Sequence, residues 1–393
     1  MNWLLFFLIF PHLKPAFFEA SWPMVDTAFD VARVASFLVI CFLLIKRKKM
    51  PSLVSWLIVA LEAYLVLITV CHGGYIRNLA IFGMTVIAFC FIIDYYSQNM
   101  NKMCATLLLA FEIVVYIELI SIPWFRDQYI VNPNVSMQHI YFLGHENNVF
   151  GYLAPAVLLA LANAKLNGQR LRAAFLIVAC YAIVFITFPA SAAVAFAVMV
   201  GVALLFLLPG LRKPVLYPIY FLFTVAGSLA ISVFHITERP GPLNWVIVNV
   251  LHKTPNLSNR TIVWDGFFKV MRGHYLFGLG ASYEEWIYYP QYQKDFTNAH
   301  NEYFELLLTG GIPALLLLLA IIALIGVCIY RCKDTYMICI ITIVMTGAYT
   351  AWIAENPIAI VYLLFPLAYH LLQNEEMTSA KLSCDSEQLS NEQ

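Results

Sequence analysis

The chain has 393 residues, of which 62% are hydrophobic and 12% are charged, and its formal net charge is zero. Soluble domains are about 45–50% apolar and about 25% charged, so this composition argues against a soluble enzyme, a disordered chain or a nucleic-acid-binding protein. Several apolar runs approach the roughly 20 residues that cross a bilayer as a helix. The composition therefore predicts a polytopic membrane protein that contacts the lipid bilayer and no nucleic acid.

The predicted elements are apolar helices, and together they predict an all-α fold, a transmembrane helix bundle of about 11–12 spans. In chain order they cover residues 3–18, 28–45, 52–71, 78–96, 103–124, 149–164, 172–188, 190–208, 215–234, 302–330, 336–353 and 358–373. The connection at 187–191 is short and contains Pro189, so the helices on either side of it are predicted to form an antiparallel hairpin.

Lysine and arginine are distributed unequally between the two sets of loops. If the spans alternate, one side receives Lys46, Arg47, Lys48, Lys49, Lys102, Lys165, Arg170, Arg172, Arg212, Lys213, Arg331, Lys333 and Lys381, and the short loops opposite hold only Lys14, Arg77 and Arg126. The basic side of a membrane protein faces the cytoplasm. Both termini are therefore expected in the cytoplasm, provided that the first segment crosses.

The predicted organisation has four parts. Residues 1–234 form an N-terminal transmembrane bundle, 235–301 a large outer loop with amphipathic helices, 302–373 the C-terminal transmembrane helices, and 374–393 a disordered cytoplasmic tail. Loops as long as 235–301 are uncommon unless they are functional or disordered. Its aromatic residues and a periodic stretch favour a folded loop.

The periodic stretch, residues 259–274, predicts an amphipathic helix at the outer membrane surface, with Asn259 as its N-cap and Gly273 just beyond its end. Arg260 falls in the first turn, where a cation opposes the helix dipole. With the free N–H groups of that turn it would make an anion site. A surface arginine that reaches lipid phosphates is an equally good interpretation.

A polar cluster opens the next transmembrane helix, which Asn298 is predicted to cap. It contains His300 in the first turn, followed by Asn301, Glu302 and Glu305. A neutral imidazole at the outer face is a competent general base, although such a cluster also serves simply to cap a helix. The Gly310-Gly311 pair that follows allows a kink or a close helix contact.

Further polar groups occur at the ends of other predicted helices and inside the spans. His145 and Asn147 precede the helix at 149, and Ser191 lies in the turn after Pro189. Ionisable residues within the membrane are functional candidates by default, and they are Arg33, Glu62, Glu112 and Glu118. Arg33 and Glu62 fall at similar depths, so pairing between them is as plausible as a role in catalysis.

Segment 259–311 resembles the O-antigen ligase and polymerase superfamily of bacterial surface polysaccharide assembly. The matching pattern is Arg260 with Trp264, Gly278 with Gly280, His300 with Asn301, and then the glycine pair at 310–311. The run Gly144-His145-Glu146-Asn147-Asn148 also resembles a His/Asn-rich motif of the family. The specific motifs cover about 60 residues, and the architecture fits along the whole chain.

The resemblance implies inverting, metal-independent glycosyl transfer without a cofactor on the outer face of the bacterial cytoplasmic (inner) membrane. The donor would be an undecaprenyl-diphosphate-linked oligosaccharide, and the glycan acceptor either a second lipid-linked repeat unit or lipid A-core. Arg260 would bind the diphosphate and His300 would act as the base. Expected substrate-binding residues are Trp264, Asn301, Glu302, Glu305, His145, Asn147, Ser191 and Arg33.

One departure bears on the choice between polymerase and ligase. Many ligases have an arginine in a turn between two mid-chain spans, whereas the corresponding turn here is Pro189-Ala190-Ser191-Ala192-Ala193. Another cation, such as Arg77, Arg126 or Arg272, could replace it. The outer loop is also nearly neutral and offers no basic platform for lipid A-core. These features favour a polymerase over a ligase, with a transporter as the alternative from another class.

Overall fold

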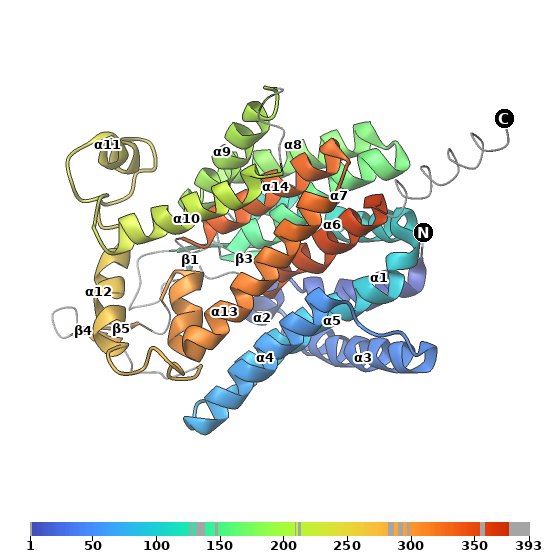
Figure 1. The fold of residues 1–393 in the computed structure, drawn as a ribbon, viewed down its shortest axis with the longest axis horizontal. Helices are drawn as coiled ribbons and strands as arrows, with labels where there is room; N and C mark the ends of the chain where they lie inside the picture. The colour runs from blue at the N-terminus through green and yellow to red at the C-terminus, as the bar shows by residue number, and fades with distance from the viewer. Residues whose placement is uncertain are drawn as a thin grey trace.

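The computed structural model of the protein describes residues 2–125, 129–130, 138–145, 148–208, 210, 214–281, 287–289, 294–296, 299–353 and 358–376. Helices dominate this part of the chain (Figure 1). The strands are short and lie in the outer connections, in one antiparallel sheet with order β1-β2-β3 and in the hairpin β4-β5. They are β1 Tyr129–Ile130, β2 Gln138–Tyr141, β3 Gly144–His145, β4 Ile287–Tyr289 and β5 Lys294–Phe296.

All the predicted segments contain helix. Before the large outer loop the helices are α1 Trp3–Ile9, η1 Phe10–Leu13, α2 Phe17–Ser21, α3 Pro23–Arg47, α4 Leu53–Cys71, α5 Ile76–Tyr96, η2 Ser97–Asn99, α6 Met100–Phe125, α7 Val149–Asn167, α8 Arg170–Thr187, α9 Ala190–Leu205 and α10 Leu216–Ser232. The loop contributes α11 Pro242–Asn249 and α12 Arg260–Val270. After it come α13 Glu302–Arg331, α14 Thr335–Ala351, η5 Ala359–Leu363 and a helix over 364–376.

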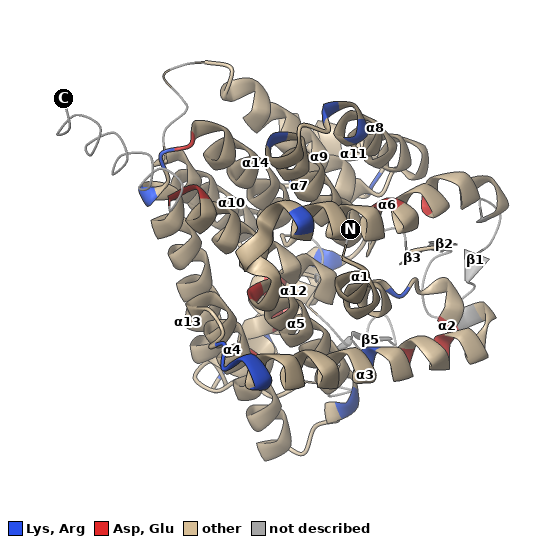
Figure 2. Ribbon diagram, turned by 90° about the vertical axis from the view of Figure 1, so that its right-hand side faces the viewer, with Lys and Arg blue, Asp and Glu red and all other residues tan. Residues whose placement is uncertain are grey.

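The protein is an all-α polytopic membrane helix bundle. Among the described residues, six helical stretches are long and apolar enough to cross a membrane, and one of them, Ile76–Trp124, comprises both α5 and α6. Other apolar helices, including α9, α10 and α14, are shorter. Figure 2 shows long uncharged stretches of ribbon, with Lys and Arg gathered mainly near the ends of helices. This is the distribution that the cost of placing a charge in hydrocarbon requires.

The first apolar segment differs from the single helix predicted over residues 3–18. It is divided into α1 and η1, and α2 follows as a separate short helix. The backbone N–H of Asn2 donates to Thr106 Oγ1 near the start of α6, whereas Phe17 N–H donates to the carbonyl of Phe142 in the outer connection. The segment thus runs along most of the length of α6. Pro11 lies within η1, at the point where the α-helix gives way to the tighter one.

The mid-chain helices do not form the predicted hairpin. Although α8 and α9 are joined at Pro189, α8 packs mainly against α7 and α9 mainly against α14. Small residues allow the second contact, because a side chain at Gly347 would collide with Met199. The two helices therefore diverge, and long-range packing decides where α9 lies.

Helix α13 is broken at Gly311, whose φ of 66° and ψ of −161° interrupt the helix. The sequence predicts a kink or a close contact at the Gly310-Gly311 pair, and the structure has both. The N–H groups of Leu279 and Gly280 donate to the carbonyls of Leu308 and Thr309, at 2.7 and 2.9 Å. The backbone groups freed by the break are thus bonded to the turn that follows α12.

Of the four ionisable residues predicted within the membrane, Arg33, Glu112 and Glu118 have hydrogen-bond partners, whereas Glu62 has a buried carboxylate oxygen without one among the described residues. Arg172 pairs with Glu112 through two guanidinium nitrogens, and Glu118 accepts a hydrogen bond from Leu143 N–H. Of the two alternatives for Arg33 and Glu62, the structure does not show the pairing. Arg33 instead donates to the Pro11 carbonyl and to Asp30, because η1 and the first turns of α3 lie closer to it than α4 does.

Candidate active site

The first component of the site is the beginning of α12, where Arg260 is the first helical residue and is half-buried. The helix is shorter than the predicted 259–274, because it ends at Val270 and continues as a turn. Asn259 occupies the N-cap position, but its φ is 73° and its side chain makes no capping hydrogen bond. In place of a side-chain cap, the Thr261 N–H donates to the Asn256 carbonyl at 3.4 Å, so the preceding turn closes onto the start of α12.

Trp264 fixes this helix to the chain that precedes α13. Its side chain is fully buried, and its indole N–H donates to the Ala299 carbonyl at 2.9 Å. It lies in a small core with Phe267 and Phe304, whose rings stack with centroids 4.7 Å apart. Arg260 lies one helical turn before Trp264, and His300 directly follows Ala299. The hydrogen bond between Trp264 and Ala299 therefore connects the helix that carries Arg260 with the turn that carries His300.

His300 does not lie in the first turn of α13, as predicted, but immediately before the helix. Its φ of 47° is left-handed, and Asn301 is the N-cap in place of Asn298, which lies outside the described residues. The Asn301 side-chain oxygen accepts from the N–H groups of Tyr303 and Phe304. A left-handed non-glycine residue stores strain of the order of 1–3 kcal/mol. The contacts of the neighbouring residues maintain this strained conformation, which keeps His300 out of the helix on a half-buried turn.

The residues around His300 are tied to three other parts of the protein. Asn301 is fully buried and donates to Ser228 Oγ on α10 and to the Ile353 carbonyl. Glu302 is buried and accepts a hydrogen bond of 2.6 Å from Tyr362. Glu305 accepts from Ala299 N–H at 2.8 Å, so it holds the residue that also binds Trp264. These contacts fix the backbone on both sides of His300.

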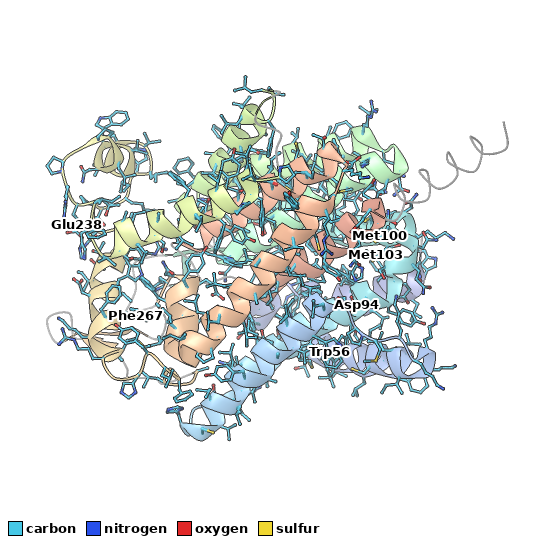
Figure 3. The ribbon with its side chains drawn as sticks, viewed as in Figure 1. Trp56, Asp94, Met100, Met103, Glu238 and Phe267 are labelled. Atoms are coloured by element: carbon cyan, nitrogen blue, oxygen red, sulfur yellow. The ribbon has the colours of Figure 1, made fainter. Side chains whose placement is uncertain are left out.

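A second set of contacts holds the N-terminal end of α12 against the end of α10. Thr261 Oγ1 donates to Glu238 at 2.6 Å, and His235 lies 3.4 Å from Glu238 and 3.2 Å from Asp265. Figure 3 places Glu238 and Phe267 on the same side of the molecule as α12, far from Asp94. Arg260 is thus attached to a helix that is fixed at its start as well as through Trp264.

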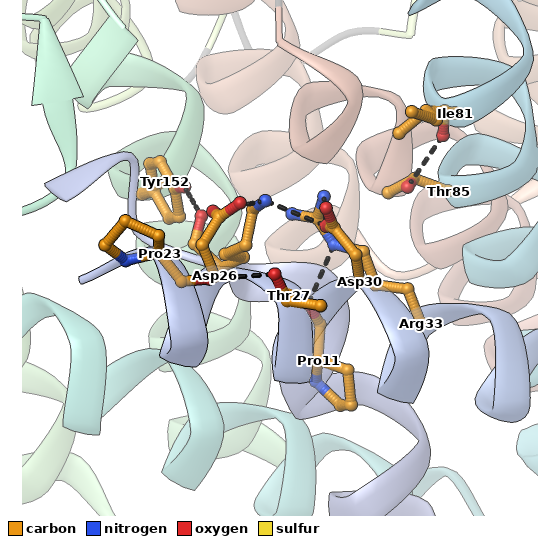
Figure 4. Close-up of polar contacts among 10 residues, drawn as sticks. Pro11, Pro23, Asp26, Thr27, Asp30, Arg33, Ile81, Thr85 and Tyr152 are labelled. Atoms are coloured by element: carbon orange, nitrogen blue, oxygen red, sulfur yellow. Dashed lines mark hydrogen bonds and ion pairs between the residues drawn. The ribbon is translucent and has the colours of Figure 1, made fainter. Parts of the chain in front are cut away.

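A polar cavity of about 560 Å³ opens between α2, α3, α5, α7 and η5, and we refer to it as the outer cavity. Arg33 lies in its wall with Lys14 and with Asp26 and Asp30 of α3 (Figure 4). Arg77, one of the cations suggested as a replacement for the missing ligase arginine, also lines it. The structure therefore brings together Arg33 and Arg77, which the sequence treated separately.

The remaining predicted site residues are less closely described. Ser191 lies in the first turn of α9, and its buried hydroxyl has no hydrogen-bond partner among the described residues. His145 ends strand β3, and Asn148, the N-cap residue of α7, lies in the wall of the outer cavity. Asn147 lies outside the described residues, as do Arg126 and most of the aromatic stretch 282–298. Among the residues that are described, no three His, Cys, Asp or Glu side chains are grouped as a metal site needs.

Sequence reasoning missed several residues of these sites. Lys14 was counted only as a loop charge, although it forms ion pairs of 2.7 and 2.8 Å with Asp26 and Asp30. The spacing of Asp26, Asp30 and Arg33 could have revealed them, because residues three and four apart share one face of a helix. Tyr362 gave no such signal, since it lies 60 residues from its partner Glu302.

Comparison with known proteins agrees with the pattern around Arg260 and His300. Residues 155–319 match the model of a protein family described as O-antigen ligase. No curated protein matches the chain. The matched segment contains α12, the buried Trp264 contact, His300 and the break in α13, whereas Ile353, Tyr362 and the outer cavity lie outside it. The match of residues 155–319 confirms the resemblance to the O-antigen ligase and polymerase superfamily and supports glycosyl transfer in surface polysaccharide assembly.

Proposed function

We propose that the protein polymerises the repeat units of O-antigen, capsule or exopolysaccharide on the outer face of the cytoplasmic membrane. The donor is a glycan linked to undecaprenyl diphosphate, and the acceptor is a second lipid-linked repeat unit. The observation that carries this proposal is the 2.9 Å hydrogen bond from Trp264 to the Ala299 carbonyl. It joins the helix that begins with Arg260 to the turn that holds His300.

In the proposed reaction Arg260 binds the diphosphate of the donor. A guanidinium can hold phosphate oxygens in a bidentate manner. The acceptor hydroxyl oxygen attacks the anomeric carbon from the face opposite the diphosphate. A new carbon–oxygen bond forms, the bond to the phosphate oxygen breaks, and undecaprenyl diphosphate leaves with the electron pair. His300 takes the proton from the attacking hydroxyl.

Negative charge builds up on the diphosphate as its bond to the sugar breaks, so the step needs a cation to stabilise it and a base. In the proposed mechanism Arg260 supplies the positive charge in place of a metal ion. The contacts of Asn301, Glu302 and Glu305 hold the base in place. Positioning of this kind contributes to rate because the base must lie within hydrogen-bond distance of the proton it removes.

A ligase that moves the finished glycan to lipid A-core or another surface acceptor is the second candidate, and the description of the matched family favours it. The composition of the outer loop argues for the polymerase. Residues 235–301 contain the cations Arg239, Lys253, Arg260, Lys269, Arg272 and Lys294 against the anions Glu238, Asp265, Glu284, Glu285 and Asp295. Such a balanced loop would attract the phosphates of lipid A-core only weakly.

A transporter is a weaker candidate, although α13 is broken. Transporters use the free backbone groups of broken helices to bind ions or substrates. Here the carbonyls of Leu308 and Thr309 accept from the backbone, and the Gly310 carbonyl accepts from the Tyr64 hydroxyl at 2.9 Å. The backbone carbonyls at the break therefore bind the outer loop and α4, and do not remain open for a substrate.

Deletion of the gene tests the proposal. A polymerase mutant should lose the ladder of long chains and keep single repeat units, and a plasmid copy should restore the ladder. The analysis needs gels of the surface glycan and mass spectrometry of the lipid-linked pool. Accumulation of full-length polymer on undecaprenyl diphosphate would instead identify a ligase. An unchanged glycan would exclude both enzymes.

A further inference from the structure

The outer cavity is a second polar site, which neither the family match nor the proposed chemistry assigns. All of its lining residues lie before residue 155 or after residue 319, so the cavity is outside the segment that matches the O-antigen ligase family. It is nevertheless next to the proposed catalytic turn. Phe82 in its wall packs edge-on against Tyr362, with ring centroids 5.8 Å apart, and Tyr362 donates to Glu302, two residues from His300.

The charges of the outer cavity balance. Its cations are Lys14, Arg33 and Arg77, and its carboxylates are Glu19, Asp26 and Asp30. Lys14 is neutralised by ion pairs to two aspartates, and Arg33 lies 3.4 Å from Asp30. A diphosphate would need an excess of positive charge. An uncharged ligand with many hydroxyl groups suits such a wall better, because it can donate to the carboxylates and accept from the cations.

His12 provides an unsatisfied acceptor in the same wall. The Ser36 hydroxyl donates its one hydrogen to the Leu8 carbonyl at 2.6 Å, so it must accept from His12 Nε2, which lies 3.2 Å away. A neutral imidazole with its proton on Nε2 has a bare Nδ1. That atom is buried and has no hydrogen-bond partner among the described residues. A buried polar atom without a partner is costly, and a hydroxyl donor would satisfy it.

The mouth of the cavity also has an unused donor. Arg77 is exposed in the first turn of α5, and it forms no hydrogen bond or ion pair with any residue that the structure describes. The volume of about 560 Å³ lies within the usual range for small-ligand pockets. Phe82 and Tyr152 add aromatic surface, on which the apolar face of a sugar can lie.

We propose that the outer cavity binds the terminal sugar residues of the acceptor glycan and thereby selects which repeat unit is extended. This inference rests on the proposed function, since it assumes that a glycan is the acceptor. Acceptor hydroxyls donate to His12 Nδ1 and to Asp26 and Asp30, and Arg77 donates to oxygens at the mouth. The donor diphosphate binds elsewhere, at Arg260.

Binding without turnover tests the proposal. The protein is reconstituted in lipid nanodiscs, and the probe is the free oligosaccharide of one repeat unit, released from the host's own polymer. We expect His12→Phe and Arg77→Ala each to weaken its binding about tenfold, the usual effect of losing one good hydrogen bond to a charged or buried partner. Arg239→Ala, an exposed arginine of the outer loop, is the matched control. If the His12→Phe protein does not fold, the oligosaccharide affinity of Arg77→Ala alone tests the proposed site.

Undecaprenyl diphosphate without sugar is the second probe, and it separates the two sites. Its affinity should be unchanged in Arg77→Ala and reduced in Arg260→Ala. Unchanged oligosaccharide affinity in a folded Arg77→Ala protein overturns the acceptor site, whatever the activity of the enzyme. If the oligosaccharide depends on the cavity but His300→Ala still transfers sugar at the normal rate, the proposed catalytic role fails and the binding site stands.

Discussion

At the scale of single residues, the structure gives the predicted site residues different tasks. Trp264 and Asn301 are fully buried, and their polar atoms bind Ala299, Ser228 and Ile353. These contacts are all within the protein, so the two residues hold the surrounding backbone in position. Arg260 and His300 are half-buried, on a helix start and on a left-handed turn. In the proposed mechanism Arg260 and His300 act on the substrate, and the buried residues position them.

This division predicts a specific pattern of mutant kinetics. His300→Ala should lower the rate of transfer roughly 10²–10⁴-fold, the usual cost of removing a general base. Arg260→Ala should be similarly impaired, and Arg260→Lys should recover little, because lysine cannot form the bidentate fork. All three proteins should reach the membrane in normal amounts. The assay is polymer formation from purified lipid-linked repeat units.

The controls for these variants are His252→Ala and Arg239→Ala, two exposed residues of the same outer loop. Both should keep normal activity. Activity should also survive EDTA. Wild-type rates in His300→Ala and Arg260→Ala, or loss of activity on chelation, would contradict the assigned roles.

At the scale of elements, the decisive contact joins the turn after α12 to the break in α13. Gly278 has a φ of 72°, and a Cβ there would lie 2.7 Å from the backbone nitrogens of Gly310 and Gly311. Gly280 approaches Thr69 of α4 in the same way, at 2.9 Å. Only glycine lets these backbones approach so closely. The outer loop is therefore attached to the bundle at these glycines as well as through the Trp264 contact.

A matched pair of alanine substitutions tests this contact. Gly278→Ala introduces both backbone strain and a collision with α13, so it should lower the thermal midpoint by several degrees and abolish most activity. Gly273→Ala introduces strain alone, because its φ is 89° but nothing lies within 4 Å of the added carbon. It should cost about 1 kcal/mol and keep most activity. The thermal midpoint is measured by unfolding in detergent. Equal decreases in the two variants would mean that the close contact with α13 contributes nothing to stability beyond the backbone strain.

At the scale of the whole molecule, α11 and α12 lie at one side and the beginning of α1 lies at the other (Figure 1). The basic clusters after α3 and after α13 follow helix ends on the side away from α12. We therefore expect reporters fused after Lys49, Arg172 or Lys333 to lie in the cytoplasm, and a reporter within α11 to lie outside. Alkaline phosphatase and green fluorescent protein fusions measure this, since each is active on one side only. If the phosphatase fusion within α11 is inactive and the fluorescent fusion there is bright, the proposed active site lies on the cytoplasmic side, and the proposal is contradicted.

The sequence by itself determined the fold class, the helices and the candidate catalytic pair. Each of these depends on local information, namely apolar runs of membrane length, the placement of lysine and arginine, and a motif within about 60 residues. The tertiary structure decided the partners. Arg33 binds Asp30 and Pro11 instead of Glu62, α9 packs on α14 instead of α8, and Glu302 is held by Tyr362. In a membrane almost every apolar face can pack against several neighbours. The choice among them depends on small residues and buried hydrogen bonds between segments far apart in the chain, which no local pattern encodes.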